Sequence, residues 1–383
     1  MSRPHRAVVL GAGAAGLSAA NRLAIHAGRG DADLEVVLVD RSTHHVFLPG
    51  FVSVLLDGAA ADGFRRPLAS LVRPGVRVVT GAVEGIDPGG GVVSGEFGEL
   101  AFDSLVVALG AEVGWPGEAP VEDVTPWTEA GTRRGASLLG RLGPGDRVVV
   151  APATPAYRCP PAVFDLAVRV RRRTGAEVTV AHPWPRPLAP FGEEPAARFE
   201  DMLAGAGVRF VGGFQLAEAA PGRLRSQAGA VLDCDAAMVV PPHRSPAAVA
   251  ASVLAGDGGW MAVGYPGLSH PDFPHVYGVG DVVAPSLRVG MAGTLGVFEG
   301  AFVAGRIVEA AGGPPAGPAP RMAAICFVDQ ETTGSFLHCD FSGPAAGTGP
   351  ARCTLMPDLP YFRRARRLFA EEWFASTIGG EVA

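Results

Sequence analysis

Short apolar runs ended by glycine alternate along the chain with longer segments that have helical spacing. Residues 6–10 form such a run before Gly11, and this pattern is typical of a strand buried in a parallel sheet. Residues 14–27 predict a helix, and residues 34–39 predict the next strand. The first forty residues therefore predict one strand–helix–strand unit.

The pattern restarts after Trp115, where "DRVVVAPATPAYRCPPAVFDLAVRVRRRTGAEVTVAHP" again predicts strand, loop, helix and strand. A Pro/Gly linker at 312–321 precedes a last segment with alternating strand residues and a helix from about Pro360. We predict an α/β fold with two Rossmann-like dinucleotide-binding domains and a C-terminal segment. The expected boundaries are 1–115 with 266–312 for the first domain, 116–265 for the second, and 321–383 for the C-terminal segment.

The composition narrows the function classes. The net charge is −6, so the protein has no overall positive charge that would attract nucleic acid. All 32 basic residues are arginine, which excludes a mechanism that needs a lysine, such as a Schiff base. No apolar run reaches the length of a membrane-spanning helix, and the N-terminus lacks a signal-peptide pattern, so we expect a cytoplasmic protein. Structural disulfides are unusual there, so the five cysteines are expected to pack, bind metal or react.

Gly11, Gly13 and Gly16 form a G-x-G-x-x-G motif between the first strand and its helix, and Asp40 ends the second strand. Gly11 permits a tight turn, Gly13 lets the backbone approach a pyrophosphate, and Gly16 allows the helix to pack closely on the strand. The helix N-terminus offers free N–H groups to phosphates, and a carboxylate at Asp40 suits ribose hydroxyls. These features predict a dinucleotide site.

Two later stretches favour FAD over NAD. "FDSLVVALG", which ends at Gly110, and "VYGVGDVV", with Gly280 and Asp281, resemble the second and third FAD signatures of two-dinucleotide-domain flavoproteins. In that superfamily the aspartate that corresponds to Asp281 bonds the ribityl chain; the alternative is a simple turn residue. We further expect four residues to contact the cofactor: Ala14, Arg41, Val83 and Gly296.

The second strand–loop–helix unit lacks the glycine motif and reads "APATPAYRC" instead. Bulky side chains and prolines replace the glycines that would let a backbone wrap a pyrophosphate, and proline removes N–H donors. We therefore expect that this second domain does not bind NAD(P)H and that electrons enter by another route.

Four motifs carry a more specific resemblance. "YRCPPAVFD" (157–165), "VVPPHRSP" (239–246), "FPHVYGVGD" (273–281) and "ICFVD" (325–329) resemble the sulfide:quinone oxidoreductase family and its relative, the flavoprotein subunit of flavocytochrome c sulfide dehydrogenase. The resemblance covers nearly the whole chain. It implies that FAD is the cofactor, that sulfide or a small sulfur species donates electrons, and that a quinone accepts them.

The resemblance also implies that Cys159 and Cys326 are a redox pair, bridged as a disulfide or persulfide beside the flavin. Such chemistry needs a thiolate, and Cys159 stands before Pro160 and Pro161, residues that suit the first turn of a helix. For each cysteine the alternative is a buried, inert thiol. Asp165 lies where relatives carry an acidic side chain and could relay a proton, or it could be a solvated helix charge.

No role follows from the family for Cys234, Cys339 and Cys353, which are expected to pack in the core or at the surface. No Cys/His cluster has zinc spacing, so we expect no metal.

Three departures from the family pattern stand out. The region before Cys159 lacks the third cysteine that is usual in the family, and Thr294 replaces the lysine of a Lys-x-Gly motif. The stretch "HHVFLPGF" has no cysteine that could bind the flavin covalently, so FAD is expected to be non-covalent. Loss of the lysine charge should change the flavin potential.

The C-terminal helix has Phe362, Phe369 and Trp373 on one face, and a cluster of arginines near its start: Arg363, Arg364, Arg366 and Arg367. This face could dock on the inner face of the cell membrane, as relatives do to reach quinone, or it could pack on the protein's own core.

We therefore expect an FAD-dependent, sulfide:quinone oxidoreductase-like enzyme; a homo-oligomer is compatible with the sequence. The alternatives are an NAD(P)H-dependent flavoprotein of the type II NADH dehydrogenase kind and a non-enzymatic flavoprotein redox sensor.

Overall fold

The computed structural model describes residues 3–378. Its first layer is a five-stranded parallel sheet in the order β19-β9-β1-β2-β5. Four of its strands come from the first 110 residues, whereas β19 follows the whole second sheet in sequence. The sheet is therefore built from two separate stretches of chain. Its strands are β1 (His5–Leu10), β2 (Leu34–Asp40), β5 (Val76–Thr80), β9 (Ser104–Val107) and β19 (Val276–Gly278).

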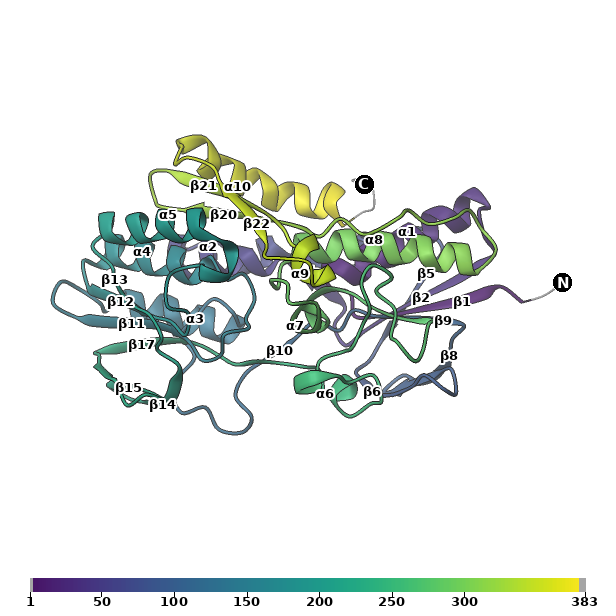
Figure 1. Ribbon diagram of the computed structural model, residues 1–383, viewed down its shortest axis with the longest axis horizontal. Helices are drawn as coiled ribbons and strands as arrows, with labels where there is room; N and C mark the ends of the chain where they lie inside the picture. Colours follow the sequence, from purple (N-terminus) through teal and green to yellow (C-terminus); the bar gives the residue numbers. More distant parts are fainter. Residues whose placement is uncertain (1–2, 379–383) are drawn as a thin grey trace.

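A second parallel sheet, in the order β13-β12-β11-β17, forms the other half of the molecule (Figure 1). Its central strand β11 is buried from Val148 to Pro152 because helices and loops cover both of its faces. The strands are β11 (Arg147–Pro152), β12 (Glu177–Ala181), β13 (Arg209–Val211) and β17 (Ala236–Val240). The fold class is thus as predicted, a mixed α/β fold with two Rossmann-like parallel sheets.

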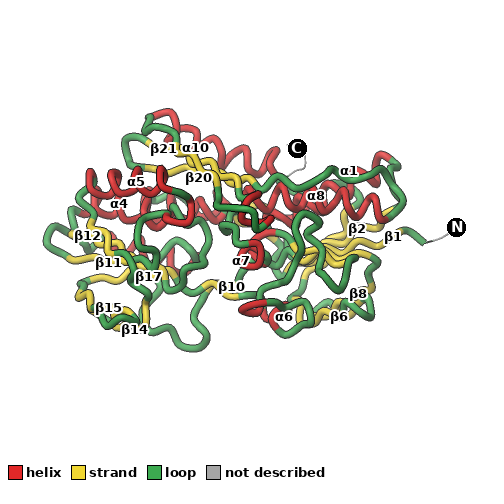
Figure 2. Tube along the Cα trace, viewed as in Figure 1, coloured by secondary structure: helices red, strands yellow, loops and turns green. Residues whose placement is uncertain are grey.

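Helices cover the sheets in a layer that Figure 2 shows in red above the yellow strands. Helix α1 (Ala14–Arg29) and helix α8 (Gly293–Ala310) lie against each other over the first sheet. Their close approach depends on small residues, since a Cβ atom at Gly300 would lie 2.2 Å from the carbonyl oxygen of Ala15. Helices α4 (Ala162–Thr174) and α5 (Glu193–Gly205) cover the second sheet.

A third, antiparallel sheet, β20-β21-β22, follows the linker and lies near the junction of the two halves. The chain then ends in helix α10 (Pro360–Glu372), which begins at a proline, a residue suited to a first helical turn, and continues into a π-helical turn, Trp373–Thr377. The strands are β20 (Ala323–Asp329), β21 (Gly334–Asp340) and β22 (Arg352–Leu355).

The remaining elements are short. The other helices are α2 (Phe51–Asp57), α3 (Glu129–Leu139), α6 (Ala247–Ala250), α7 (Ala284–Leu287) and α9 (Ser342–Ala346). The remaining strands form small antiparallel groups: β3 (His44–Val46) with β4 (Arg65–Pro67); β6 (Val83–Asp87), β7 (Val92–Gly95) and β8 (Gly98–Ala101); β10 (Glu112–Val113) with β18 (His243–Arg244); and β14 (Leu216–Ala220), β15 (Arg223–Ser226) and β16 (Val231–Asp233).

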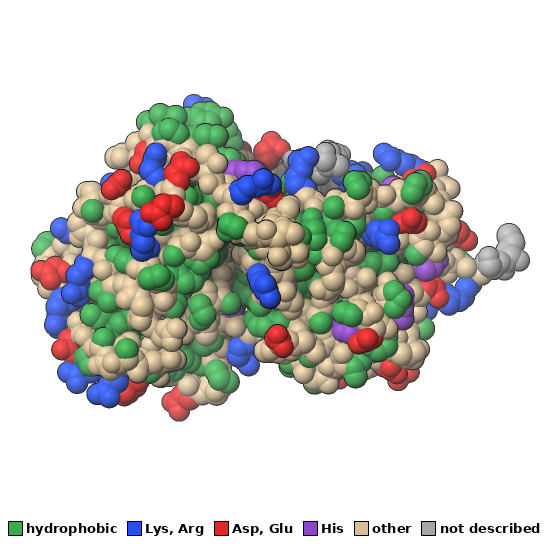
Figure 3. Space-filling view, in the orientation of Figure 1, with side chains coloured by type: hydrophobic (Ala, Val, Ile, Leu, Met, Phe, Trp, Pro, Cys, Tyr) green, Lys and Arg blue, Asp and Glu red, His purple; other side chains and the backbone are tan. Residues whose placement is uncertain are grey.

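The predicted elements are confirmed with small shifts at their ends. The first helix, predicted over residues 14–27, extends to Arg29. On the face shown in Figure 3, acidic and basic side chains are mixed rather than gathered into one basic area. Among the described residues, no helix is long and apolar enough to cross a membrane.

Candidate functional site

A cavity of about 1210 Å³ lies where the first sheet, the second sheet and the C-terminal segment meet. The residues predicted to bind cofactor or react line this cavity, with the exception of Gly16. The predicted residues in its wall are Gly11, Gly13, Ala14, Asp40, Arg41, Val83, Gly110, Cys159, Asp165, Gly280, Asp281, Gly296 and Cys326.

The glycine loop has the shape that a dinucleotide requires. Gly11 has φ +98°, and a Cβ atom there would lie 2.4 Å from the carbonyl oxygen of Ala108. Gly16 lies behind the cavity wall, where a Cβ atom would lie 1.8 Å from the carbonyl oxygen of Gly11. Gly13 has no atom within 4 Å of its would-be Cβ, and no side chain caps α1. The loop therefore leaves room and amide N–H groups for a pyrophosphate.

Asp40 is held in place by the glycine loop itself. Its Oδ2 accepts a hydrogen bond from the Ala12 amide at 2.6 Å, and its Oδ1 accepts one from the Ser42 amide at 2.7 Å. The carboxylate thus fixes the loop while it borders the cavity.

Asp281 is paired with Arg158, a residue that sequence reasoning missed. The Arg158 Nε lies 2.6 Å from Asp281 Oδ2, and a second guanidinium N–H donates to the Ala111 carbonyl at 2.8 Å. Next to Asp281, the Gly280 amide donates to Glu299 Oε2 at 2.5 Å, and burial raises the pKa of Glu299 to about 8. The local sequence does not predict a role for Arg158 or Glu299, because each contacts a residue of another element. Arg158 contacts Asp281, and Glu299 contacts Gly280.

Cys159 and Cys326 meet in this cavity. Cys159 lies in the loop before α4 with φ +51°, a conformation that non-glycine residues adopt mainly at turns and functional sites. Cys326 lies in the middle of β20. The two thiols are free, part-buried and linked by a side-chain hydrogen bond.

The two sulfurs have different electrostatic surroundings. The hydrogen bond from Cys326 lowers the pKa of Cys159, and so do the charge of Arg366 and the Ala162 amide at the start of α4. The pKa of Cys326 is raised, first because its thiol donates to Cys159 and then because it is buried. The negative charge of a reduced pair is therefore favoured on Cys159.

Asp165 is buried and does not face solvent, so the reading of a solvated helix charge is wrong. Its Oδ2 contacts Arg366 at 3.0 Å and accepts from the Asp329 amide at 3.4 Å, whereas Oδ1 has no hydrogen-bond partner within the described residues. Burial raises its pKa to about 6 against the opposing arginines. Asp165 borders the same cavity as both thiols.

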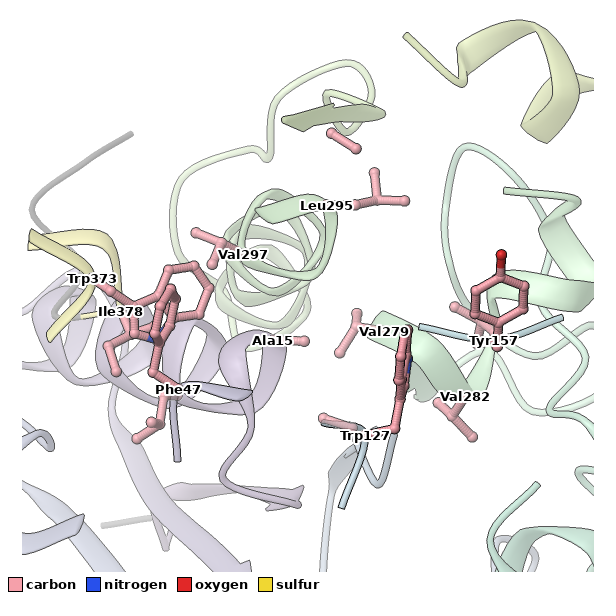
Figure 4. Close-up of a cluster of buried hydrophobic side chains, with 14 of the residues drawn as sticks. Ala15, Phe47, Trp127, Tyr157, Val279, Val282, Leu295, Val297, Trp373 and Ile378 are labelled. Atoms are coloured by element: carbon pink, nitrogen blue, oxygen red, sulfur yellow. The ribbon is translucent and has the colours of Figure 1, made fainter. Parts of the chain in front are cut away.

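Aromatic side chains pack around the "APATPAYRC" loop, which stands where a second glycine motif would be expected. The Tyr157 ring is buried, and its hydroxyl contacts His182 Nε2 at 2.9 Å and donates to the Pro160 carbonyl at 3.2 Å. The Trp127 indole donates to the Arg158 carbonyl at 2.8 Å. Figure 4 shows Trp127 and Tyr157 among the buried side chains of this region. The loop is thus held by side-chain packing.

The aromatic side chains of the C-terminal helix pack on other parts of the protein. Trp373 is buried, and its ring lies against that of Phe47 (Figure 4). The ring of Phe369 also contacts Phe47. Phe362 stacks on Phe336. The aromatic side chains Phe362, Phe369 and Trp373 therefore pack against the protein, which is one of the two alternatives that the sequence left open.

Thr294 occupies the position of the family's lysine, at the start of α8. Its hydroxyl accepts a hydrogen bond from the Ile325 amide at 3.2 Å, next to Cys326. This hydrogen bond connects the first turn of α8 to β20. The threonine side chain is neutral, so it contributes no positive charge to the cavity.

The expectation that Cys339 and Cys353 only pack is wrong, because a disulfide joins them. They stand directly opposite each other on β21 and β22, which brings their Cα atoms to 4.1 Å. Cys234 is a buried free cysteine in an apolar cluster, as expected. Within residues 3–378, no three His, Cys, Asp or Glu side chains are grouped to hold a metal ion.

Comparisons with known proteins agree with this architecture. The family described as pyridine nucleotide-disulphide oxidoreductase matches residues 5–149. The sulfide:quinone oxidoreductase from Aquifex aeolicus superposes with a TM-score of 0.85 at 21% identity, over 99% of this chain and 92% of that chain. An NAD-dependent persulfide reductase from A. fulgidus superposes with a TM-score of 0.65 at 20% identity, over 90% and 66% of the two chains.

A type II NADH:quinone oxidoreductase, Ndh, from Mycobacterium tuberculosis is 35% identical over 116 residues, 28% of this chain and 24% of its own length. The match thus spans about a quarter of that relative. The family match covers less than half of the chain, and the superpositions show a shared fold with two Rossmann-like parallel sheets. This fold is similar to that of the sulfide:quinone oxidoreductase.

Proposed function

We propose that the protein oxidises sulfide or another small sulfur species through Cys159 and Cys326 and passes two electrons through FAD to a quinone. The observation that carries this proposal is the contact between these two thiols at the wall of the dinucleotide cavity. Two cysteines from distant parts of the chain line the same cavity as the glycine loop. A flavin bound to this loop would therefore lie in the same cavity as the two thiols.

FAD would be held without a covalent bond. The α1 N-terminus and Gly13 would take the pyrophosphate, Asp40 the ribose, and the Asp281 region the ribityl chain. When bound, FAD supplies a two-electron acceptor for the thiol pair and a donor to quinone.

The sulfur step is a thiol–disulfide exchange. Hydrosulfide attacks Cys326 in an oxidised Cys159–Cys326 bridge, a new S–S bond forms a persulfide on Cys326, and the bridge bond breaks. Cys159 leaves as the thiolate, which its surroundings favour. The bridge takes up the two electrons that the sulfide sulfur loses, and FAD, when bound, would accept them from the thiol pair. The proton released when hydrogen sulfide becomes hydrosulfide goes to a base in the cavity.

Asp165 is the proposed base. A carboxyl group with a pKa of about 6 is suited to exchange protons near neutral pH, and its Oδ1 is without a hydrogen-bond partner among the described residues. Its position in the first turn of α4 borders the cavity that holds both thiols.

The quinone would occupy the apolar part of the same cavity. This part is lined by aromatic and aliphatic side chains from α2 and the segments before and after it, and from α10 and the turn that follows it, which suit a flat apolar ring. These side chains are Phe47, Leu48, Val52, Phe64, Phe369 and Trp373.

The competing function is oxidation of NADH, which the Ndh match favours for the N-terminal part of the chain. The matched proteins are named for that activity, but the second loop here is packed with Tyr157, Trp127 and His182. Anaerobic stopped-flow mixing decides between the two donors. We expect rapid flavin bleaching by sulfide and none by NADH; the reverse result would overturn the proposal.

Steady-state turnover with sulfide and a soluble quinone tests the acceptor. Quinone reduction above the buffer blank supports the enzyme reading. Flavin bleaching by sulfide without quinone reduction would instead support a redox sensor.

A further inference from the structure

Helix α10 brings one arginine to the thiol pair. Phe369 and Trp373 anchor the helix on Phe47, and Arg366 and its neighbour Arg367 line the same cavity as Cys159 and Cys326. The Arg366 side chain is 16% exposed. It thus reaches the cavity from the last helix, in a part of the chain far from both cysteines.

The charged groups around the thiols are distributed over three elements. Helix α4 contributes Asp165 and the fully buried Arg169, β20 contributes Asp329, and α10 contributes Arg366. Arg169 lies 2.7 Å from Asp57 and 2.8 Å from Glu331, and its Nη1 atom lies 3.9 Å from Asp329.

Arg366 contacts two carboxylates that line the same cavity as the thiols. Its Nη1 atom lies 3.0 Å from Asp165 and 3.6 Å from Asp329. When Asp165 takes up a proton, Arg366 loses part of its counter-charge and can stabilise another anion in the cavity. Proton uptake by Asp165 and negative charge on Cys159 are therefore coupled through this guanidinium.

We propose that Arg366 is the positioning residue of the thiol pair, whose guanidinium holds the negative charge on the Cys159 sulfur after the Cys159–Cys326 bridge opens. The inference rests on the proposed function of this pair and adds a residue from the C-terminal helix. The amide of Ala162 at the start of α4 assists, because it also faces the sulfur.

The test measures the thiol directly and needs no sulfide. The reduced holoprotein is alkylated with iodoacetamide at a series of pH values, and modification of Cys159 is followed by peptide mass spectrometry. In Arg366→Gln we expect the pH midpoint to rise by about one unit, so that the rate below the midpoint falls about tenfold. Arg366→Lys, which keeps the charge, should restore most of the rate.

Arg363→Gln is the matched control, because Arg363 lies one turn earlier on α10 and contacts Asp329 at 3.3 Å. It should leave the midpoint unchanged. Asp165→Asn removes the neighbouring negative charge and should shift the midpoint in the opposite direction, to lower pH. Thermal unfolding of each holoprotein shows whether α10 remains packed.

An unchanged midpoint in Arg366→Gln would overturn the inference, as would an equal shift in Arg363→Gln. If Arg366→Gln does not fold, Asp165→Asn decides: it removes the nearest counter-charge of Arg366, and a midpoint that does not fall contradicts the role of Arg366. Failure of sulfide to reduce the flavin, with the Arg366 effect intact, would refute the proposed function alone.

Discussion

The Trp373 indole donates a hydrogen bond to His45 Nε2 at 3.0 Å. An indole N–H can only donate, so Nε2 is the acceptor and the other ring nitrogen carries the proton. That nitrogen donates to the Ala12 carbonyl in the glycine loop at 2.9 Å. Burial lowers the pKa of His45, which keeps the ring neutral. The C-terminal segment is thereby connected to the dinucleotide loop.

Trp373→Phe should weaken both stability and cofactor binding. The variant keeps an aromatic ring but leaves the buried His45 Nε2 without a donor, which costs about 1–3 kcal/mol. We expect a lower thermal midpoint and about tenfold weaker FAD binding in a fluorescence titration. Trp184→Phe is the control, since Trp184 packs on Tyr157 and Phe191 in the second sheet's aromatic cluster. Equal FAD affinity in Trp373→Phe and wild type would contradict the connection.

Replacement of either reactive thiol should abolish sulfide-driven flavin reduction. In Cys159→Ser and Cys326→Ser we expect the anaerobic bleaching rate to fall by several orders of magnitude, because neither variant can form the bridge that hydrosulfide attacks. Cys234→Ser should keep the rate, since this cysteine is buried in a separate apolar cluster. Fast bleaching in both single variants would rule out the Cys159–Cys326 bridge as the entry point.

Local features of the fold were predictable because they depend on neighbouring residues. The glycine loop, its strand and its helix were all found from residues 6–40. The alternative of a solvated charge at Asp165 was wrong because α10 and β20, which come much later in the chain, cover this turn of α4.

Contacts between distant elements could not be found in this way. Arg366 was recognised only as one of four arginines on an amphipathic helix, and the helical pattern alone does not say what its apolar face covers. The meeting of Cys159 and Cys326 followed from the family resemblance and from no local pattern. The Cys339–Cys353 disulfide was missed because its formation depends on the register of β21 and β22.

Asp165→Asn should change how stability depends on pH. The folded-state pKa of Asp165 is about 6, raised from 3.8, so its contribution is fully present below pH 3.8 and is lost as the pH rises through 6. Two pKa units correspond to about 3 kcal/mol. An asparagine cannot ionise, so the stability of the variant relative to wild type should increase by about that amount between pH 4 and pH 8.

Thermal unfolding of both proteins over this pH range provides the measurement. Asp165→Glu is a suitable control, because it retains an ionisable carboxyl group and should retain a pH-dependent loss of stability. A stability difference between Asp165→Asn and wild type that stays constant from pH 4 to pH 8 would show that Asp165 is not buried with a raised pKa.

The Cys339–Cys353 disulfide should stabilise the C-terminal sheet. It closes a loop with a sequence separation of 14, and a loop of this size restricts the unfolded chain by about 3 kcal/mol. The double variant Cys339→Ala with Cys353→Ala should therefore unfold at a lower temperature, and addition of a reductant should lower the midpoint of the wild type but not that of the variant. Cys339 pairs with Ala324 on β20, two residues from Cys326, so loosening of this sheet should also slow sulfide-driven bleaching. Labelling of both cysteines by a thiol reagent in unfolded, unreduced protein would show that the disulfide is absent.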